Sequence, residues 1–182
     1  MTKFTTTLSI LVLTLNMGCV NKVQHIGLKA AKSKSTPLQL ACSKSIRLID
    51  DRTSQELSNT RNVMLIADGS LKWLATTLQG QVETGQLSFV QPDDKTSQVD
   101  ATITIKRLSV DFHGNAIAGQ VLLAWSQPNT DIIYARGIDT QFNLGDSHGE
   151  IRSVLNNSLK QSLEKLTPAL STCPNSASAK AS

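Results

Sequence analysis

The chain has 182 residues, of which 40% are hydrophobic and 18% are charged, and its formal net charge is +4. Residues 22–47 carry six cations and no acid, whereas residues 48–182 carry eleven cations and fourteen acids, so the positive charge belongs to the N-terminal part. The basic residues are not interleaved with aromatic side chains that could stack on bases, which argues against a nucleic-acid partner.

Residues 1–18 have the three parts of a bacterial secretory signal peptide. An early lysine precedes an apolar, Thr-rich stretch from Phe4 to Leu15, and small residues come just before Cys19. The stretch is about a dozen residues long, too short for the roughly 20 that span a bilayer. Gly18 and Cys19 resemble a lipobox, although Asn16 stands where a leucine is usual. We expect Cys19 to be lipidated as the first mature residue, and the alternative is an ordinary signal peptide with an incidental cysteine.

The residues after Cys19 predict where the anchor holds the protein. Val20 replaces the aspartate that is typical of inner-membrane retention, so we expect the periplasmic face of the outer membrane. Several acyl chains together anchor stably. Residues 19–41 are predicted to be a lipidated, basic and flexible tether. Its cations either lie against anionic head groups or only keep the tether soluble, and the sequence leaves both open.

The first half of the folded part is predicted to contain short strands and one helix. Apolar and β-branched runs predict strands at residues 45–50 and 86–90, and a short strand or a buried turn at residues 63–66. The polar segment between the first two strands is predicted to be a loop. Leucines then recur with the spacing of one helix face, which predicts a helix from Ser70, its capping residue, to about Thr84.

The second half is predicted to be an antiparallel meander followed by a helix. Strong alternation predicts a strand at residues 100–112, and turns at residues 113–115 and 126–131 separate it from two further long strands at residues 116–125 and 132–144. The alternation slips at Lys106 and Arg107, which predicts a β-bulge there. Ser147 and Glu150 have the spacing of a capping box and open a final amphipathic helix, with Pro168 following its last turn.

These elements predict an α+β fold with a mixed, mostly antiparallel sheet and two amphipathic helices packed on one face. The single domain is expected to cover residues 42–173, with a disordered tail at residues 174–182.

Cys42 and Cys173 bracket this domain, and a disulfide between them is favoured in an oxidising compartment. The alternative is two free thiols in flexible flanks.

No motif for catalysis or metal binding is evident in the sequence. His25, His113 and His148 are scattered, without a second ligand at helical spacing, so we expect no metal and no cofactor. The motifs of serine hydrolases, phosphate-binding loops and zinc proteases do not occur, so an enzyme is not expected. Asp51 and Arg52 at the end of the first strand are more suggestive, but an Asp–Arg pair that orders the loop is the better explanation.

A partner surface is the remaining candidate site. Its predicted residues are Asp51, Arg52, Trp125 and Tyr134, because the first two place charges at a strand end and the aromatic residues lie in long strands. A long strand at an open sheet edge can accept a partner strand. Aromatic side chains in alternating strands belong more often to the core, and this alternative stays open.

Several segments resemble the YajG family of uncharacterised bacterial envelope lipoproteins. They are the strand that ends in Asp-Asp-Arg-Thr, the Leu-rich helix, the run from Ile105 to Gly119 (IKRLSVDFHGNAIAG) and the closing helix. The resemblance covers roughly residues 42–167. It implies a lipid-anchored envelope protein, and no catalytic residue transfers because the family has no established active site. The Cys42–Cys173 pair is not expected across that family.

The sequence therefore favours a non-catalytic binding or assembly module that is anchored in the outer membrane. The expected partner is an envelope protein, a glycolipid or a cell-wall fragment. Similar small α+β lipoproteins serve as auxiliary subunits of lipid or lipopolysaccharide transport systems, which is the alternative. An envelope hydrolase and a passive spacer between membrane and cell wall are weaker alternatives.

Overall fold

The structure is a computed structural model, and it describes residues 22–31, 37–60, 63–94, 96–142, 145 and 148–173. The predicted signal peptide, Cys19, Ser147 and the predicted tail at residues 174–182 lie outside these ranges. Among the described residues, no helix is both long enough and apolar enough to cross a membrane.

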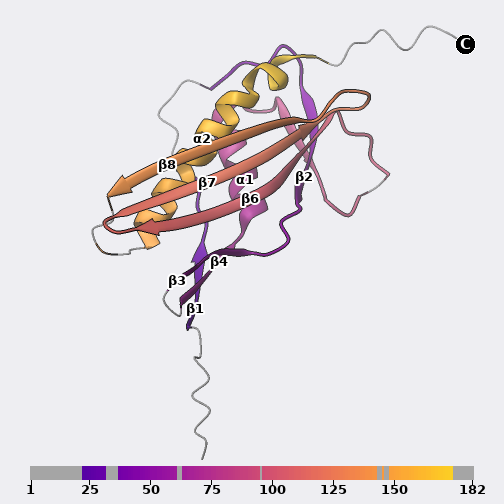
Figure 1. Ribbon diagram of the computed structural model, residues 1–182. Helices are drawn as coiled ribbons and strands as arrows, with labels where there is room; N and C mark the ends of the chain where they lie inside the picture. Colours follow the sequence, from indigo (N-terminus) through magenta and orange to yellow (C-terminus); the bar gives the residue numbers. More distant parts are fainter. Residues whose placement is uncertain are drawn as a thin grey trace, which may run out of the picture.

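The larger sheet has five strands in the order β5-β2-β6-β7-β8. Their bounds are β2 (Lys44–Asp50), β5 (Leu87–Val90), β6 (Ala101–His113), β7 (Ala116–Ser126) and β8 (Ile133–Phe142). β2 pairs in parallel with both β5 and β6, whereas β6, β7 and β8 form the predicted antiparallel meander. These three long strands run side by side in front of the helices in Figure 1.

A smaller sheet of three strands has the order β1-β4-β3. Its strands are β1 (Lys22–Gly27), β3 (Glu56–Thr60) and β4 (Val63–Asp68). β4 is central, with β1 parallel to it on one side and β3 antiparallel on the other. This sheet lies beneath the long strands at the lower end of Figure 1.

Two helices cover one face of the larger sheet. α2 (His148–Ser171) packs against β7 and β8, and α1 (Ser70–Gln81) packs against β2. The helices also touch each other, because Trp73 Nε1 donates a hydrogen bond of 2.8 Å to Asn156 Oδ1. The predicted fold class is therefore confirmed, with the strands divided between two sheets instead of one.

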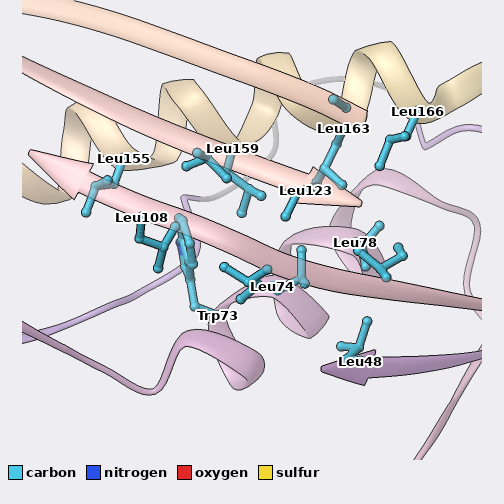
Figure 2. Packing of buried hydrophobic residues seen from close by; sticks show 14 of the residues in the cluster. Leu48, Trp73, Leu74, Leu78, Leu108, Leu123, Leu155, Leu159, Leu163 and Leu166 are labelled. Atoms are coloured by element: carbon cyan, nitrogen blue, oxygen red, sulfur yellow. The ribbon is translucent and has the colours of Figure 1, made fainter. Parts of the chain in front are cut away.

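The core lies between the long strands and the two helices. Figure 2 shows leucines of α2 and α1 pointing toward side chains of β6 and β7. Leu159 and Leu163 of α2, Leu74 of α1 and Leu123 of β7 are all completely buried. Burial of each such side chain contributes about 1.5–3 kcal/mol. The sheet and both helices thus share one hydrophobic core.

Small residues let α2 approach the sheet closely. The buried hydroxyl groups of Ser158 and Ser162 donate to the carbonyl oxygens of Gly119 and Val121 over 2.8 and 3.1 Å. A Cβ atom added at Gly137 in β8 would stand 1.8 Å from the carbonyl oxygen of Ser158. Backbone therefore packs directly on backbone at this point.

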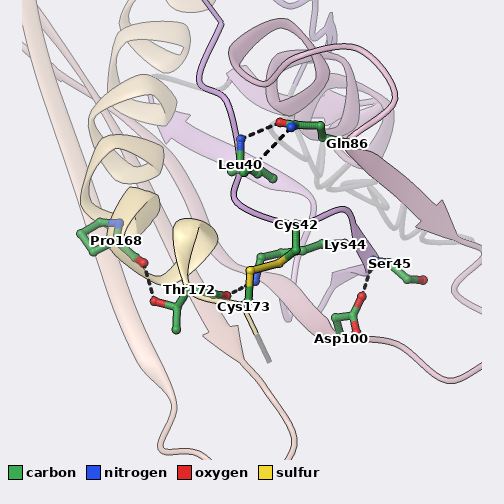
Figure 3. Close-up of a disulfide and its surroundings, with 9 residues drawn as sticks. All are labelled: Leu40, Cys42, Lys44, Ser45, Gln86, Asp100, Pro168, Thr172 and Cys173. Atoms are coloured by element: carbon green, nitrogen blue, oxygen red, sulfur yellow. Dashed lines mark hydrogen bonds between the residues drawn. A yellow bond between two sulfur atoms is a disulfide. The ribbon is translucent and has the colours of Figure 1, made fainter. Parts of the chain in front are cut away.

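Cys42 and Cys173 form the predicted disulfide (Figure 3). Their Cα atoms are 5.9 Å apart although the residues are separated by 131 positions. Beside the bond, Lys44 is only 1% exposed and donates from Nζ to the carbonyl oxygen of Thr172. Burial lowers the pKa of Lys44, an effect that Asp100 partly offsets. The bond joins the beginning of the larger sheet to the end of α2.

Two predicted loops contain strands. The predicted flexible tether at residues 19–41 includes β1, whose Ile26 is completely buried and inserts into the core. The predicted loop between the first two strands includes β3, which Leu57 anchors at 3% exposure. Each strand contributes one buried apolar side chain, and the other large apolar residue of β1, Val23, is exposed. One buried side chain is too little to produce a visible period in the sequence.

Two helix boundaries also differ from the prediction. Ser70 does not cap α1, because Gly69 occupies that position with a φ of 73° and the Ser70 hydroxyl points to Asp50 instead. α2 continues past Pro168 to Ser171. Leu170, after the proline, is 2% exposed and packs in the core, which holds the last turn in place.

Candidate functional site

The predicted partner surface divides into buried and exposed residues. Trp125 is 1% exposed, so its assignment to a surface is wrong. It pairs with Ile103 of β6, which faces the helices, and its side chain therefore points into the core. Tyr134, by contrast, is 61% exposed on the opposite face of the sheet.

Tyr134 belongs to a row of apolar side chains on β8. Tyr134, Ile138 and Phe142 are spaced by four residues, so they lie on the same face of the strand. They are 61%, 45% and 79% exposed, respectively. We call these three residues the outer row. β8 is the last strand of the larger sheet in the described part of the chain, so the outer row runs along a sheet margin.

Side chains of α2 cover the middle of this margin. Gln161 Oε1 accepts a hydrogen bond from the Ile138 backbone N–H over 3.2 Å, and Lys165 Nζ donates to the Arg136 carbonyl oxygen over 2.6 Å. Such contacts occupy the backbone groups to which a partner strand would bind. The outer face of β8, rather than its central edge, is therefore the accessible apolar surface.

Asp51 and Arg52 directly follow β2, which lies on the other side of β6 from β8. Only the Arg52 side chain is buried. The Arg52 side chain is 4% exposed and forms a two-point ion pair with Asp50, with Nε and Nη2 each 2.7 Å from a carboxylate oxygen. Ser70 donates a further hydrogen bond to Asp50. Asp51 is 59% exposed and pairs with Lys106 at 2.5 Å. The Asp–Arg pair thus orders the end of β2 and ties it to α1.

The environment of Asp50 favours its ionised form. Burial alone would raise the pKa of this carboxyl group, but the hydrogen bonds from Arg52 and Ser70 and the charge of Arg52 outweigh it and lower the pKa. The hydrogen bond from Lys106 to Asp51 likewise raises the pKa of that exposed ammonium group. The two pairs thus favour the charged forms of Asp50 and Lys106.

We expect Asp50→Asn to destabilise the protein by about 2 kcal/mol at neutral pH, because it removes a charged acceptor from a buried guanidinium group. A lowered folded-state pKa means that Asp50 stabilises the fold above its unfolded-state pKa. That contribution is lost as the pH falls through the folded-state pKa. Urea unfolding at several pH values should therefore show weaker acid sensitivity in the variant.

Asp51→Asn is the matched control, because it neutralises the neighbouring exposed carboxylate. An exposed pair contributes at most about 1 kcal/mol, so the control should unfold close to the parent protein. Equal losses of stability in the two variants would contradict the structural role assigned to Asp50.

A groove lies beside this ion pair, between β3 and the second half of β6. Its volume is about 430 Å³, and its walls come from residues 52–58 and 106–111. β2 pairs with β6 only as far as Ile105, which leaves the following residues of β6 open toward β3. The register of β6 shifts between Ile105 and Arg107, as the change of alternation predicts. The resulting bulge places Lys106 and Arg107 next to each other on one wall.

Two buried polar atoms at the groove lack a hydrogen-bond partner among the described residues. They are Nη1 of Arg52 and Oγ of Ser109. The sequence predicts Arg52 as a candidate site residue but gives no signal for Ser109, because the two residues come together only through the pairing of β2 with β6. The slip at Lys106 was the single sequence signal that pointed to this part of β6.

The histidines do not form a site in the structure. His25 lies in β1 and its Nδ1 is 3.1 Å from the Asp68 carboxylate. Within the described residues, no three His, Cys, Asp or Glu side chains are arranged to hold a metal ion.

No family model matches the chain, and no curated protein matches it. Among solved structures, it is similar to a Xanthomonas campestris protein described as family-model DUF330, with a TM-score of 0.49 and 8% identity, covering 82% of this chain and 94% of that one. It is also similar to a PelC variant from Paraburkholderia phytofirmans, described as a dodecamer, with a TM-score of 0.41 and 13% identity, covering 76% of this chain and 96% of that one.

Proposed function

We propose that the protein is a non-catalytic binding or assembly module of the bacterial envelope, of YajG-like type, which binds a partner protein through the outer row. The observation that carries this proposal is the exposure of Tyr134, Ile138 and Phe142 on one face of an ordered strand. Clustered large apolar side chains on a soluble surface mark interaction sites.

The chemistry of the outer row favours a protein over a sugar or a charged lipid head group. Tyrosine and phenylalanine are enriched at the centres of protein interfaces, where they fill apolar pockets of the partner. Arg136 and Thr140 lie between the apolar residues on the same face and supply polar contacts at their rim. Because α2 covers the middle of the strand edge, the partner would lie on the sheet face.

The proposed anchor is the lipidated Cys19 in the outer membrane. The signal-peptide pattern of residues 1–18 supports export, and the Cys42–Cys173 disulfide is consistent with an oxidising compartment. β1 begins at Lys22, three residues after Cys19, and three residues reach at most about 10 Å. An anchored domain would therefore sit directly on the membrane surface, with the small sheet nearest to the lipid.

Photo-crosslinking in intact cells tests this proposal. A photoreactive amino acid at Tyr134 of the full chain should give a specific adduct with an envelope protein. The same amino acid at Thr76, an exposed position on α1, serves as the matched control and should give none. Ile138→Asp should reduce the Tyr134 adduct by about tenfold, because it buries a charge at the contact.

Identical adducts from both positions, or none from Tyr134, would refute the binding role of the outer row.

The anchor is tested separately in the same cells, since Cys19→Ser should move the protein from the membrane fraction to the soluble periplasmic fraction. A protein that stays in the membrane fraction after this change would refute lipidation of Cys19.

A further inference from the structure

The groove between β3 and β6 contains donor groups that no residue in the described part of the chain satisfies. Arg52 directs Nε and Nη2 to Asp50 and Ser70, which leaves Nη1 buried without an acceptor. Ser109 Oγ, on the β6 side of the groove, is also buried without a hydrogen-bond partner. A buried polar group without a hydrogen bond costs about 1–3 kcal/mol, so native proteins contain few of them.

The groove wall adds two cations to these donors. Lys106 and Arg107 stand side by side at the β6 bulge, and Lys106 is shared with Asp51. The Arg107 side chain is exposed and forms no ion pair or hydrogen bond with the described residues. Two acids, Glu56 and Asp111, also line the groove, so its charge is mixed and not uniformly positive.

We propose that this groove binds a phosphate group through Arg52, Arg107 and Ser109, with Lys106 as an additional cation. A guanidinium group pairs with phosphate through parallel N–H···O bonds, and a hydroxyl group can donate to another phosphate oxygen. Phosphate supplies acceptors in several directions, which matches donors that come from β6 and from the loop between β2 and β3.

The size of the groove indicates that the phosphate belongs to a larger molecule. Small-molecule sites commonly measure about 300–1,000 Å³. The observed 430 Å³ therefore leaves room for the group that carries the phosphate. That group is a glycerophospholipid head group or a soluble phosphomonoester. Its proposed donors are not residues of the outer row, although Lys106 lies close enough to Tyr134 for an electrostatic interaction. The proposal therefore does not depend on the function proposed above.

Titration of the mature full-length protein with inorganic phosphate tests the site. We expect saturable binding in the millimolar range, with shifts in the amide NMR signals of Ser109 and Arg107. Combining Arg107→Gln with Ser109→Ala should weaken binding by at least about tenfold, since each removes a donor to an anion. Both side chains lie outside the core, and the thermal unfolding of the variant verifies that it folds.

Lys160→Gln is the control, because it removes an exposed cation from α2, where Glu164 is its ion-pair partner at 3.9 Å. Phosphate affinity should stay within about twofold in this variant. An equal loss in Lys160→Gln and in the groove variant would show only general charge attraction and overturn the proposal.

Two further probes distinguish the possible sources of the phosphate. The unlipidated Cys19→Ser chain is mixed with phosphatidylcholine vesicles that contain phosphatidic acid, and separately with glycerol 3-phosphate. Vesicle binding that the groove substitutions abolish identifies a lipid head group, whereas binding of glycerol 3-phosphate alone identifies a soluble phosphomonoester. Failure of inorganic phosphate, the vesicles and glycerol 3-phosphate to bind would overturn the proposal.

Discussion

Gly137→Ala is expected to destabilise the domain by about 3 kcal/mol or more, because the added methyl group has no space. Its Cβ atom would stand 1.8 Å from the carbonyl oxygen of Ser158. The obstacle is helix backbone, which cannot rotate away as a side chain can. α2 would have to move off β8, with the loss of contacts at Leu159 and Leu163 in the shared core. Urea unfolding followed by circular dichroism measures the effect.

The same substitution at two other glycines provides comparison variants for this prediction. At Gly119 the added Cβ would meet Val154 at 2.9 Å, so Gly119→Ala should be less damaging than Gly137→Ala. At Gly27 nothing lies within 4 Å, and the same change should alter stability by less than about 0.5 kcal/mol. The expected order of damage is Gly137, Gly119, Gly27. A Gly137→Ala protein as stable as the Gly27→Ala protein would show that α2 does not pack against the sheet as closely as described.

Removal of the disulfide by combined Cys42→Ser and Cys173→Ser changes is expected to cost about 4–5 kcal/mol. The bond closes a loop of 131 residues and so restricts the unfolded chain strongly. Its loss also frees the end of α2, where Leu170 packs in the core and Thr172 accepts the Lys44 hydrogen bond. Denaturant unfolding under non-reducing conditions should show the lower stability.

A reducing agent provides the internal control for the disulfide. Dithiothreitol should lower the stability of the parent protein toward that of the double-serine variant and should leave the variant itself unchanged. If the reduced and oxidised parent proteins unfold at the same denaturant concentration, the bond contributes nothing to stability.

The parts of the fold with a strong local period were predictable from sequence. β6 alternates strongly along its sequence, turns delimit β7 and β8, and the slip at Lys106 located the bulge. The two amphipathic helices were evident for the same reason. β1 and β3 were missed, because Ile26 and Leu57 are their only buried apolar side chains with described burial, and the other large apolar residue of β1, Val23, is exposed.

The candidate sites were predictable only in part, because they depend on contacts between distant residues. Alternation alone does not say which face of a strand meets a helix, so Trp125 and Tyr134 both remained candidates until the register placed Trp125 opposite Ile103. Arg52 stood out as a charge at a strand end. Its place in the same groove as Ser109 follows from the parallel pairing of β2 with β6, which no local pattern encodes.

The position of β1 outside the disulfide loop determines how the protein would respond to mechanical tension. The covalent loop encloses the chain from Cys42 to Cys173, whereas β1 precedes it and is held by parallel pairing with β4. A pull between an anchored N-terminus and a partner on β8 would therefore load β1 first. Its detachment would release residues 22–37, which extend to at most about 55 Å, while the larger sheet stays closed by the covalent bond. The domain would then separate from the membrane surface with the larger sheet intact, at the cost of withdrawing Ile26 of β1 from the core.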